Sequence, residues 1–293
     1  MDRKIYFGNK TKQVWINAPQ TGMTASSQSF TSETQLLNGR SHINRSRGSH
    51  RRFQPTWVGS LNSPALESSL QTVKDFSDGV YGDGPFYWAD PFATQQNLCP
   101  PHWATPMMMQ NDLPQLWDIA PFEYLDTADN LFNYPVKSAR YVSSDTAEVS
   151  STKKLTFIIP EGYTLFFGWH GVIADGVPTM RIDRYKRSDG AVSALDTTPV
   201  AVTSSARTNT SVDGTTYSCV DIYFYNPQGE IFDFTVAGMI AQILPSSASP
   251  SLGGFISGRG TTAVEFGSTV NIEYYSSAIN DGQVGLSTEW IEV

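Results

Sequence analysis

The sequence is short of charged residues, cysteine and histidine, and each shortage argues against a class of protein. Charged residues make up 16% of the 293 residues, against about 25% in an average soluble domain, which disfavours a disordered chain or a coiled coil. The two cysteines, Cys99 and Cys219, are far apart and define neither a disulfide framework nor a zinc site. The four histidines are too scattered for an obvious metal cluster. We therefore expect neither a metal nor a cofactor.

Long apolar runs are missing as well. No stretch approaches the roughly 18 apolar residues of a membrane span, and the first eight residues lack the apolar segment of a signal peptide. We expect a soluble globular protein that is made and kept in a cytoplasm and has no membrane partner. At about 150 residues per domain, its length corresponds to one large or two ordinary domains.

The sequence does contain many short apolar and aromatic runs separated by turn residues, which is typical of a mainly β protein. Between residues 220 and 225, Val220, Ile222 and Phe224 alternate with Asp221 and two tyrosines, so one face of this strand belongs to a core. Further strands are expected at 4–7, 13–16, 53–57, 155–159, 163–169 and 231–236.

One helix is predicted, directly after residue 62. Ser63 is a good N-cap and Pro64 a good first helical residue. The apolar residues that follow have helical spacing, and a glycine ends the run; these are Leu66, Leu70, Val73, Phe76 and Gly79.

Composition divides the chain into segments. Residues 1–109 form a first β domain with the helix, 110–245 form a β-sandwich, and 246–254, rich in Ser, Pro and Gly, form a linker. Residues 255–293 are either a small terminal hairpin or strands that return to complete the first domain's sheet, and we favour the return.

Charge is distributed unevenly. Residues 1–60 carry nine Lys or Arg against two acids, a balance of +7, and the rest of the chain carries eleven against 26, a balance of −15. Five arginines fall within residues 40–52, among them Arg45, Arg47, Arg51 and Arg52. Such a run indicates an acidic partner or nucleic acid, or simply a solvated hairpin. No nucleic-acid-binding motif accompanies it, so an acidic protein surface, including that of another copy, is the simpler partner.

Residues 81–106 are punctuated by prolines and rich in aromatic residues. Their large rings need burial, either at an interface between subunits or domains or in the core of their own domain, and the two interpretations have equal weight. The rings concerned are Phe86, Tyr87, Trp88, Phe92 and Trp103.

No common catalytic motif is present, so we expect no enzyme. Cys99 and His102 have a spacing that a nucleophile and its base could have, but a packed thiol is favoured because two prolines separate them. Asp78, Asp83 and Asp90 are candidate calcium ligands that turns explain better.

Aromatic residues on or beside the expected strands of 110–245 form a candidate sugar-stacking set, with ordinary core packing as the alternative. Trp169 leads this set because His170 and Gly171 indicate a loop after it. The members are Tyr163, Trp169, Tyr185, Tyr223 and Tyr225.

Several motifs are shared with one family. They are RKIYFG at 3–8 with WINAPQTGM at 15–23, YGDGPFYWADPF at 81–92, LCPPHWATP at 98–106, and a weaker GQVGLSTEWIEV at 282–293. In these motifs the chain resembles the minor tail proteins of long-tailed, siphovirus-type phages of actinobacteria, in the group that plays the distal tail protein role. The resemblance covers about the first 106 residues, whereas 110–250 shares only a β-rich, variable character.

The resemblance implies an N-terminal β domain that forms a ring of six copies, and a peripheral sandwich of jelly-roll, galectin or carbohydrate-binding-module type. It implies a place at the tail tip of the virion, with the tail tube protein, the tape measure, the tail hub and other minor tail proteins as partners. By analogy, the arginine run would join ring neighbours or the tube. Two other functions stay open: carbohydrate-binding adsorption to host cell-wall glycan through 110–245, and degradation of the host envelope.

Overall fold

The structure is a computed structural model, and it confirms a mainly β protein with antiparallel sheets and one helix among the residues that it describes. The chain divides into two compact units, Met1–Phe86 with Ala263–Val293 and Tyr87–Thr262. The described residues are 4–19, 25–35, 41–60, 64–89, 97–99, 122–129, 134–144, 147–152, 154–176, 179–188, 198–201, 210–250, 264–275 and 283–292.

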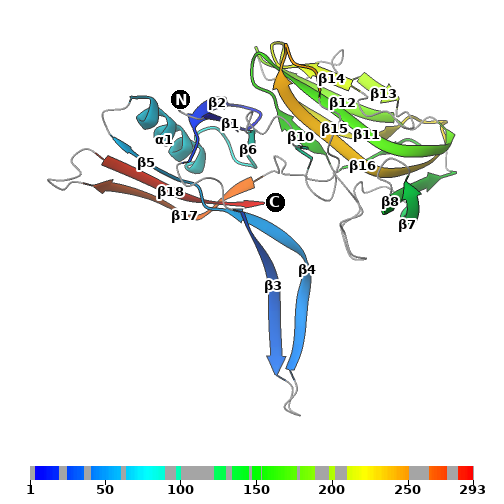
Figure 1. Cartoon of the computed structure of the whole chain (residues 1–293), viewed down its shortest axis with the longest axis horizontal. Coiled ribbons are helices and arrows are strands. Elements are labelled where there is room, and N and C mark those ends of the chain that lie inside the picture. Colours follow the sequence, from blue (N-terminus) through cyan, green and yellow to red (C-terminus); the bar gives the residue numbers. More distant parts are fainter. Residues whose placement is uncertain are drawn as a thin grey trace. The chain divides into compact units, whose positions relative to one another are not determined.

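The first unit contains a short hairpin, the helix and a five-stranded sheet (Figure 1). The hairpin pairs β1 (Lys4–Gly8) with β2 (Gln13–Asn17). The sheet has the order β17-β18-β4-β3, and β5 also pairs with β18. Its strands are β3 (Ala25–Gln35), β4 (Ser41–Phe53), β5 (Thr56–Ser60), β17 (Val264–Tyr275) and β18 (Gln283–Glu292).

The β1–β2 turn depends on Gly8 and Asn9. The Asn9 side-chain oxygen accepts hydrogen bonds from the backbone N–H groups of Thr11 (2.9 Å) and Lys12 (2.8 Å). Gly8 has a φ of 151°, and a Cβ there would lie 2.1 Å from the Lys12 carbonyl oxygen. No other residue fits this close approach of two backbones, so the hairpin that the sequence predicts is confirmed with a reason for its glycine.

The predicted helix is confirmed as α1 (Pro64–Ser77), which begins at the expected proline. Val73, Leu70 and Phe76 are buried on its apolar face. Gly79 follows the helix with a φ of +76°, the left-handed conformation in which glycine commonly ends a helix. Ser63 and the side chain of Leu66 lie outside the described residues.

The C-terminal strand β18 pairs with N-terminal residues. It runs antiparallel to β5 from Gln283↔Ser60 to Ser287↔Thr56 and then meets the end of β4 at Trp290↔Phe53. Pro55 separates β4 from β5 because it has no N–H to donate to a neighbouring strand. Its carbonyl oxygen still accepts a hydrogen bond from the Thr288 N–H (3.2 Å). Residues 41–60 and the C-terminal strand β18 therefore share one sheet.

An aromatic cluster forms the core of the first unit. Phe7 of β1 packs against Phe86 (ring centroids 4.7 Å apart), Phe76 of α1 (4.9 Å) and Trp290 of β18 (5.4 Å). Trp57 of β5 lies 6.0 Å from Trp290 and donates its indole N–H to the Asn17 carbonyl (2.7 Å). Hairpin, helix and sheet thus meet at the same rings.

The second unit contains two sheets of five strands each (Figure 1). One has the order β10-β15-β12-β13 with β9 beside β15, and the other has the order β14-β11-β16-β8-β7. Their strands are β7 (Phe122–Asp129), β8 (Tyr134–Ser143), β9 (Val149–Ser150), β10 (Leu155–Ile158), β11 (Tyr163–Gly176), β12 (Thr179–Lys186), β13 (Thr198–Ala201), β14 (Thr210–Asp213), β15 (Tyr217–Asn226) and β16 (Phe232–Pro245). The short strand β6 (Tyr87–Ala89) belongs to neither of these two sheets.

The two sheets share an aromatic core. Phe224 of β15 stacks on Phe234 of β16 (5.1 Å), and Phe234 stacks on Tyr141 of β8 (5.3 Å). Because these rings come from opposite sheets, the unit is a β-sandwich. The core face predicted for Val220, Ile222 and Phe224 is confirmed, with each residue at most 1% exposed.

The loop expected at His170–Gly171 is wrong. Strand β11 continues through both residues and pairs with β16 over its whole length. His170 faces Gly238 and Gly171 faces Val236, so Ala237 is an extra residue on β16. A β-bulge of this kind accommodates one residue without ending either strand.

Two polar side chains hold irregular parts of the sandwich. Asn97, fully buried, donates to the Met239 carbonyl (2.6 Å) and accepts from the Ala241 N–H (2.9 Å), which fixes 97–99 to β16. Arg187 donates to the carbonyls of Gly214 (2.8 Å) and Ile159 (2.5 Å) beyond the strand ends. Both satisfy backbone groups that sheet pairing leaves over.

The aromatic core makes a prediction about stability. Trp290→Ala removes a fully buried ring that contacts four aromatic neighbours and should lower the free energy of unfolding by about 3–5 kcal/mol. The matched variant Trp15→Ala removes a ring that is 37% exposed and should cost less. Urea unfolding followed by circular dichroism measures both. Equal losses would show that the cluster does not hold the unit together.

Candidate functional site

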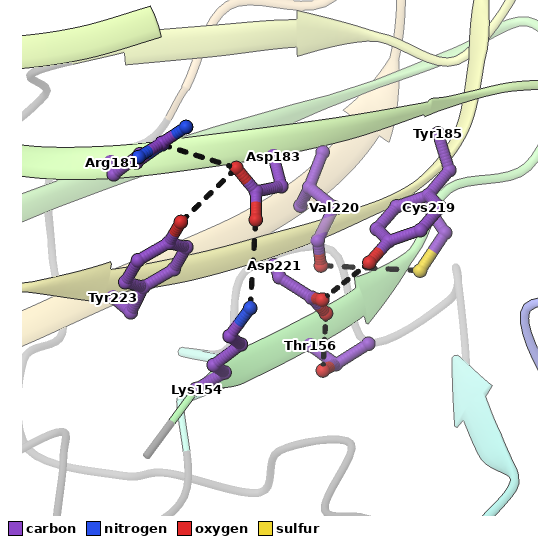
Figure 2. Close-up of polar contacts among 9 residues, drawn as sticks. All are labelled: Lys154, Thr156, Arg181, Asp183, Tyr185, Cys219, Val220, Asp221 and Tyr223. Carbon is purple, nitrogen blue, oxygen red and sulfur yellow. Dashed lines mark hydrogen bonds and ion pairs between the residues drawn. The ribbon is translucent and has the colours of Figure 1, made fainter. Parts of the chain in front are cut away.

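Seven side chains form a polar and aromatic surface on the sheet β10-β15-β12, on the face away from the sandwich core (Figure 2). Strand register places them in rows: Thr156 faces Asp221, which faces Asp183, and Arg181 faces Tyr223. We call this surface the Tyr–Asp face. Its members are Lys154, Thr156, Arg181, Asp183, Tyr185, Asp221 and Tyr223.

Asp221 is the buried centre of the Tyr–Asp face, with 1% of its surface exposed. Its two carboxylate oxygens accept hydrogen bonds from the hydroxyls of Thr156 and Tyr185, each 2.7 Å long. These bonds join β10, β15 and β12 through one side chain. A buried carboxylate needs such donors because an unpaired one is costly.

Asp183 lies directly opposite Asp221, where two like charges would repel. Cations offset this repulsion, because Lys154 lies 3.5 Å and Arg181 3.6 Å from the Asp183 carboxylate. The Tyr223 hydroxyl also donates to Asp183 (3.3 Å). The two carboxylates are therefore held by neighbours within the face.

Tyr223 has its ring and its hydroxyl engaged. The Lys154 ammonium lies 4.3 Å from the ring centroid, which is a cation–π contact. Burial, and then the nearby Asp183 carboxylate, raises the pKa of the Tyr223 hydroxyl to about 12. A sugar stacking on this ring would have to displace Lys154.

The five candidate sugar-stacking residues do not form one surface. Tyr185, Tyr223 and Tyr225 lie on β12 and β15, and the Arg181 guanidinium lies 5.1 Å from the Tyr225 ring. Tyr163 and Trp169 lie on β11 of the other sheet, and the Trp169 side chain is outside the described part.

Four of the five arginines of the run lie on β4, and Arg40 is outside the described residues. We call the paired strands β3 and β4 the arginine arm (residues 25–35 and 41–53). Among the described pairs, β4 meets β18 only at Arg52 and Phe53, and from Arg51 to Ser41 it pairs with β3 alone. Arg52 forms an ion pair with Glu289 at the base of the arm (2.9 Å). Arg45, Arg47 and Arg51 lie further along β4.

The aromatic residues of 81–106 divide between several environments. Phe86 is 2% exposed and packs in the core of the first unit, as one of the two interpretations expects. Tyr87 is buried in β6 and Trp88 is half-buried. Phe92 and Trp103 lie outside the described residues.

The residues weighed for catalysis and metal binding do not converge where the structure describes them. Cys99 is fully buried, and burial raises the pKa of its thiol far above the usual range, which suits a packed thiol. Asp78 pairs with Lys74, whereas His102 and Asp90 are outside the described part. In that part, no three His, Cys, Asp or Glu side chains gather as a metal site, and no helix is long and apolar enough to span a membrane.

Sequence reasoning missed most of the Tyr–Asp face. The alternation in 220–225 did place Asp221 and Tyr223 on one face. Lys154, Arg181 and Asp183 lack such a signal because only the pairing of β10 and β12 with β15 brings them there.

Comparison with known proteins gives only distant likenesses. No family model and no curated protein matches the sequence. The crystal structure of the infectious bursal disease virus VP2 subviral particle aligns over the whole chain and 77% of its own, at 10% identity and a TM-score of 0.24. Structures of the Gt and Gx strains of this virus align at 12% and 11% identity over 76% and 77% of their chains, both with a TM-score of 0.21. Likenesses at this level decide neither fold nor function.

The raised pKa of the Tyr223 hydroxyl predicts that the protein becomes less stable at alkaline pH. Its folded pKa is raised to about 12 from the ordinary value of 10.0. The stabilisation is therefore complete below pH 10 and is lost as pH rises toward 12, because the unfolded chain ionises first. The urea midpoint should fall more steeply over this range in the wild type than in Tyr223→Phe. Parallel curves for the two proteins would contradict the assignment.

Proposed function

We propose that this chain is a structural subunit of a virus particle, a component of a phage tail tip that forms a ring of six copies. The ring would join the tail tube to the hub and host-recognition parts, and the chain would act by assembly rather than catalysis. Its partners would be other copies of itself, the tube protein, the tape measure and other minor tail proteins.

The observation that carries this proposal is where the family-like motifs lie in the first unit. Phe7 belongs to the motif at 3–8, Phe86 to the one at 81–92 and Trp290 to the one at 282–293. The three rings pack together, with centroids 4.7 to 5.4 Å apart. Three of the segments that resemble tail proteins thus contribute to one core, which supports a shared fold for this unit.

The arginine arm supports assembly through this unit. A two-stranded hairpin is marginally stable by itself in water, and the arm's sequence offers few apolar residues for a face of its own. The −15 balance of residues 61–293 provides acidic surface on every copy. A basic arm that meets a different, acidic patch on the next copy is the head-to-tail contact that a ring requires.

The arm gives a test of assembly. Arg45→Glu with Arg51→Glu should weaken assembly by about tenfold or more. Raising salt should weaken the oligomers of the wild type, because the screening length falls from about 30 Å at 0.01 M to about 3 Å at 1 M. Light scattering coupled to gel filtration measures the mass. Arg52 is left unchanged because it pairs with Glu289 in its own chain.

The matched control is Lys4→Glu with Lys12→Glu, which reverses two exposed charges elsewhere in the first unit. It should assemble normally. The melting temperature of the arm variant should stay close to that of the wild type, because exposed charges contribute about 0–1 kcal/mol each to folding. A monomeric wild type at high concentration, or assembly indifferent to the arm's charges, would refute this proposal.

A second candidate function is binding of host cell-wall glycan by the sandwich. The favouring observation is that three candidate tyrosines lie on neighbouring strands beside two carboxylates. The hydroxyls of Tyr185 and Tyr223 bind Asp221 and Asp183, whereas Tyr225 is half-buried and its ring lies 5.1 Å from the Arg181 guanidinium.

Glycan binding beside the Tyr–Asp face predicts that Tyr225→Ala lowers retention on host cell walls while the fold is kept. Tyr163→Ala, which removes a half-buried tyrosine from the other sheet, is the matched control and should bind as the wild type does. A pull-down with purified cell walls measures retention. Binding lost with Trp169→Ala instead would place the site on the other sheet, and no binding by the wild type would exclude this function.

A further inference from the structure

Among the described strands of the second unit, β7 is the last of its sheet, and it carries acidic residues. Strand β7 is the last strand of β14-β11-β16-β8-β7, and its described pairs are all with β8. It contains Glu123, Asp126 and Asp129 and no basic residue. An edge strand presents unpaired backbone groups that a strand from another chain can bind.

The arginine arm has the complementary features. From Ser41 to Arg51, β4 pairs on one side with β3, and among the described residues nothing extends it on the other side. This stretch carries Arg45, Arg47 and Arg51 and no acid. We propose that β4 of one copy pairs edge to edge with β7 of a second copy, an inference that rests on assembly through the arm and names the surface that receives it.

The dimensions of the two strands agree. Glu123 and Asp129 are six residues apart on an unbroken stretch of pairing, about 20 Å at about 3.3 Å per residue. Arg45 faces Thr31 of β3, and Arg51 faces Ser27. Because the register shifts between these two pairs, the two arginines are separated by four residues of β3, about 13 Å. The two spans differ by about 7 Å in total, about 3 to 4 Å at each end. Side chains alternate along an unbroken strand, so Glu123 and Asp129 lie on one face of β7 and Asp126 lies on the other.

The three acids of β7 face different residues of β8. Asp126 faces Lys137 in the β7–β8 register, whereas Asp129 faces Tyr134. Glu123 faces Arg140, which makes a two-pronged ion pair with Asp233 of β16, with bonds of 2.9 and 2.7 Å. Opposite charges on the two open edges fix which edges meet, and they disfavour pairing of two arms or of two β7 strands.

A charge exchange tests the pairing in the full-length protein. Arg45→Glu with Arg51→Glu, and separately Glu123→Lys with Asp129→Lys, should each weaken assembly by about tenfold or more, and the combined variant should recover most of it. The control Glu148→Lys with Glu230→Lys reverses two exposed acids elsewhere in the second unit and should assemble normally. If the arm variant fails to assemble while the β7 variant assembles like the wild type, β7 is not the acceptor, although assembly through the arm stands.

A cross-link shows whether the contact is between copies. Under mild oxidation, Arg51→Cys protein should form a disulfide-linked heterodimer with Glu123→Cys protein if the strands run antiparallel, or with Asp129→Cys protein if they run parallel. The native Cys99 and Cys219 are fully buried and should not compete. Mixtures of Lys12→Cys with Glu123→Cys or with Asp129→Cys provide the background rate. Heterodimer yield no higher than this background would overturn the proposal, whereas a wild type that never assembles would overturn the proposed function with it.

Discussion

The packing of Phe7, Phe86 and Trp290 is the contact on which the first unit depends. These rings come from the start of the chain, from the residues after the helix and from the last strand, so the unit forms only when distant segments meet. The Asn17 carbonyl and the Trp57 indole N–H join the hairpin to the sheet beside them. The base of the arginine arm lies in this same sheet, because Phe53 pairs with Trp290 and Arg52 with Glu289.

The arm and the sandwich use charge in different ways. In the sandwich, carboxylates and cations neutralise one another within the Tyr–Asp face, and Asp221 is buried with its donors in place. In the arm, the arginines beyond Arg52 follow a strand whose described pairing is with β3 alone. Internal compensation stabilises a fold, whereas charge of one sign along an open strand suits recognition of another surface. This contrast favours the arm over the Tyr–Asp face as the part that contacts a partner.

Patterns within a short stretch of sequence correctly predicted the elements whose formation depends mainly on neighbouring residues. Pro64 and the spacing of Leu70, Val73 and Phe76 were sufficient for α1, and alternation was sufficient for the core face of β15. Features that depend on pairing between distant strands were missed. His170 and Gly171 indicated a loop, but a bulge at Ala237 of β16 keeps the strand intact. Asp183 and Lys154 gave no signal because their neighbours are defined only once β10, β15 and β12 are side by side.

The central claim is that copies of this chain assemble head to tail into a ring at a tail tip. A low-resolution electron cryomicroscopy map of intact virions, with an antibody fragment bound to this chain, tests stoichiometry and position together. The account predicts six antibody-bound copies arranged around the tail axis, at the end of the tube. Antibody density absent from the tail axis, or a single copy located elsewhere on the particle, would contradict it.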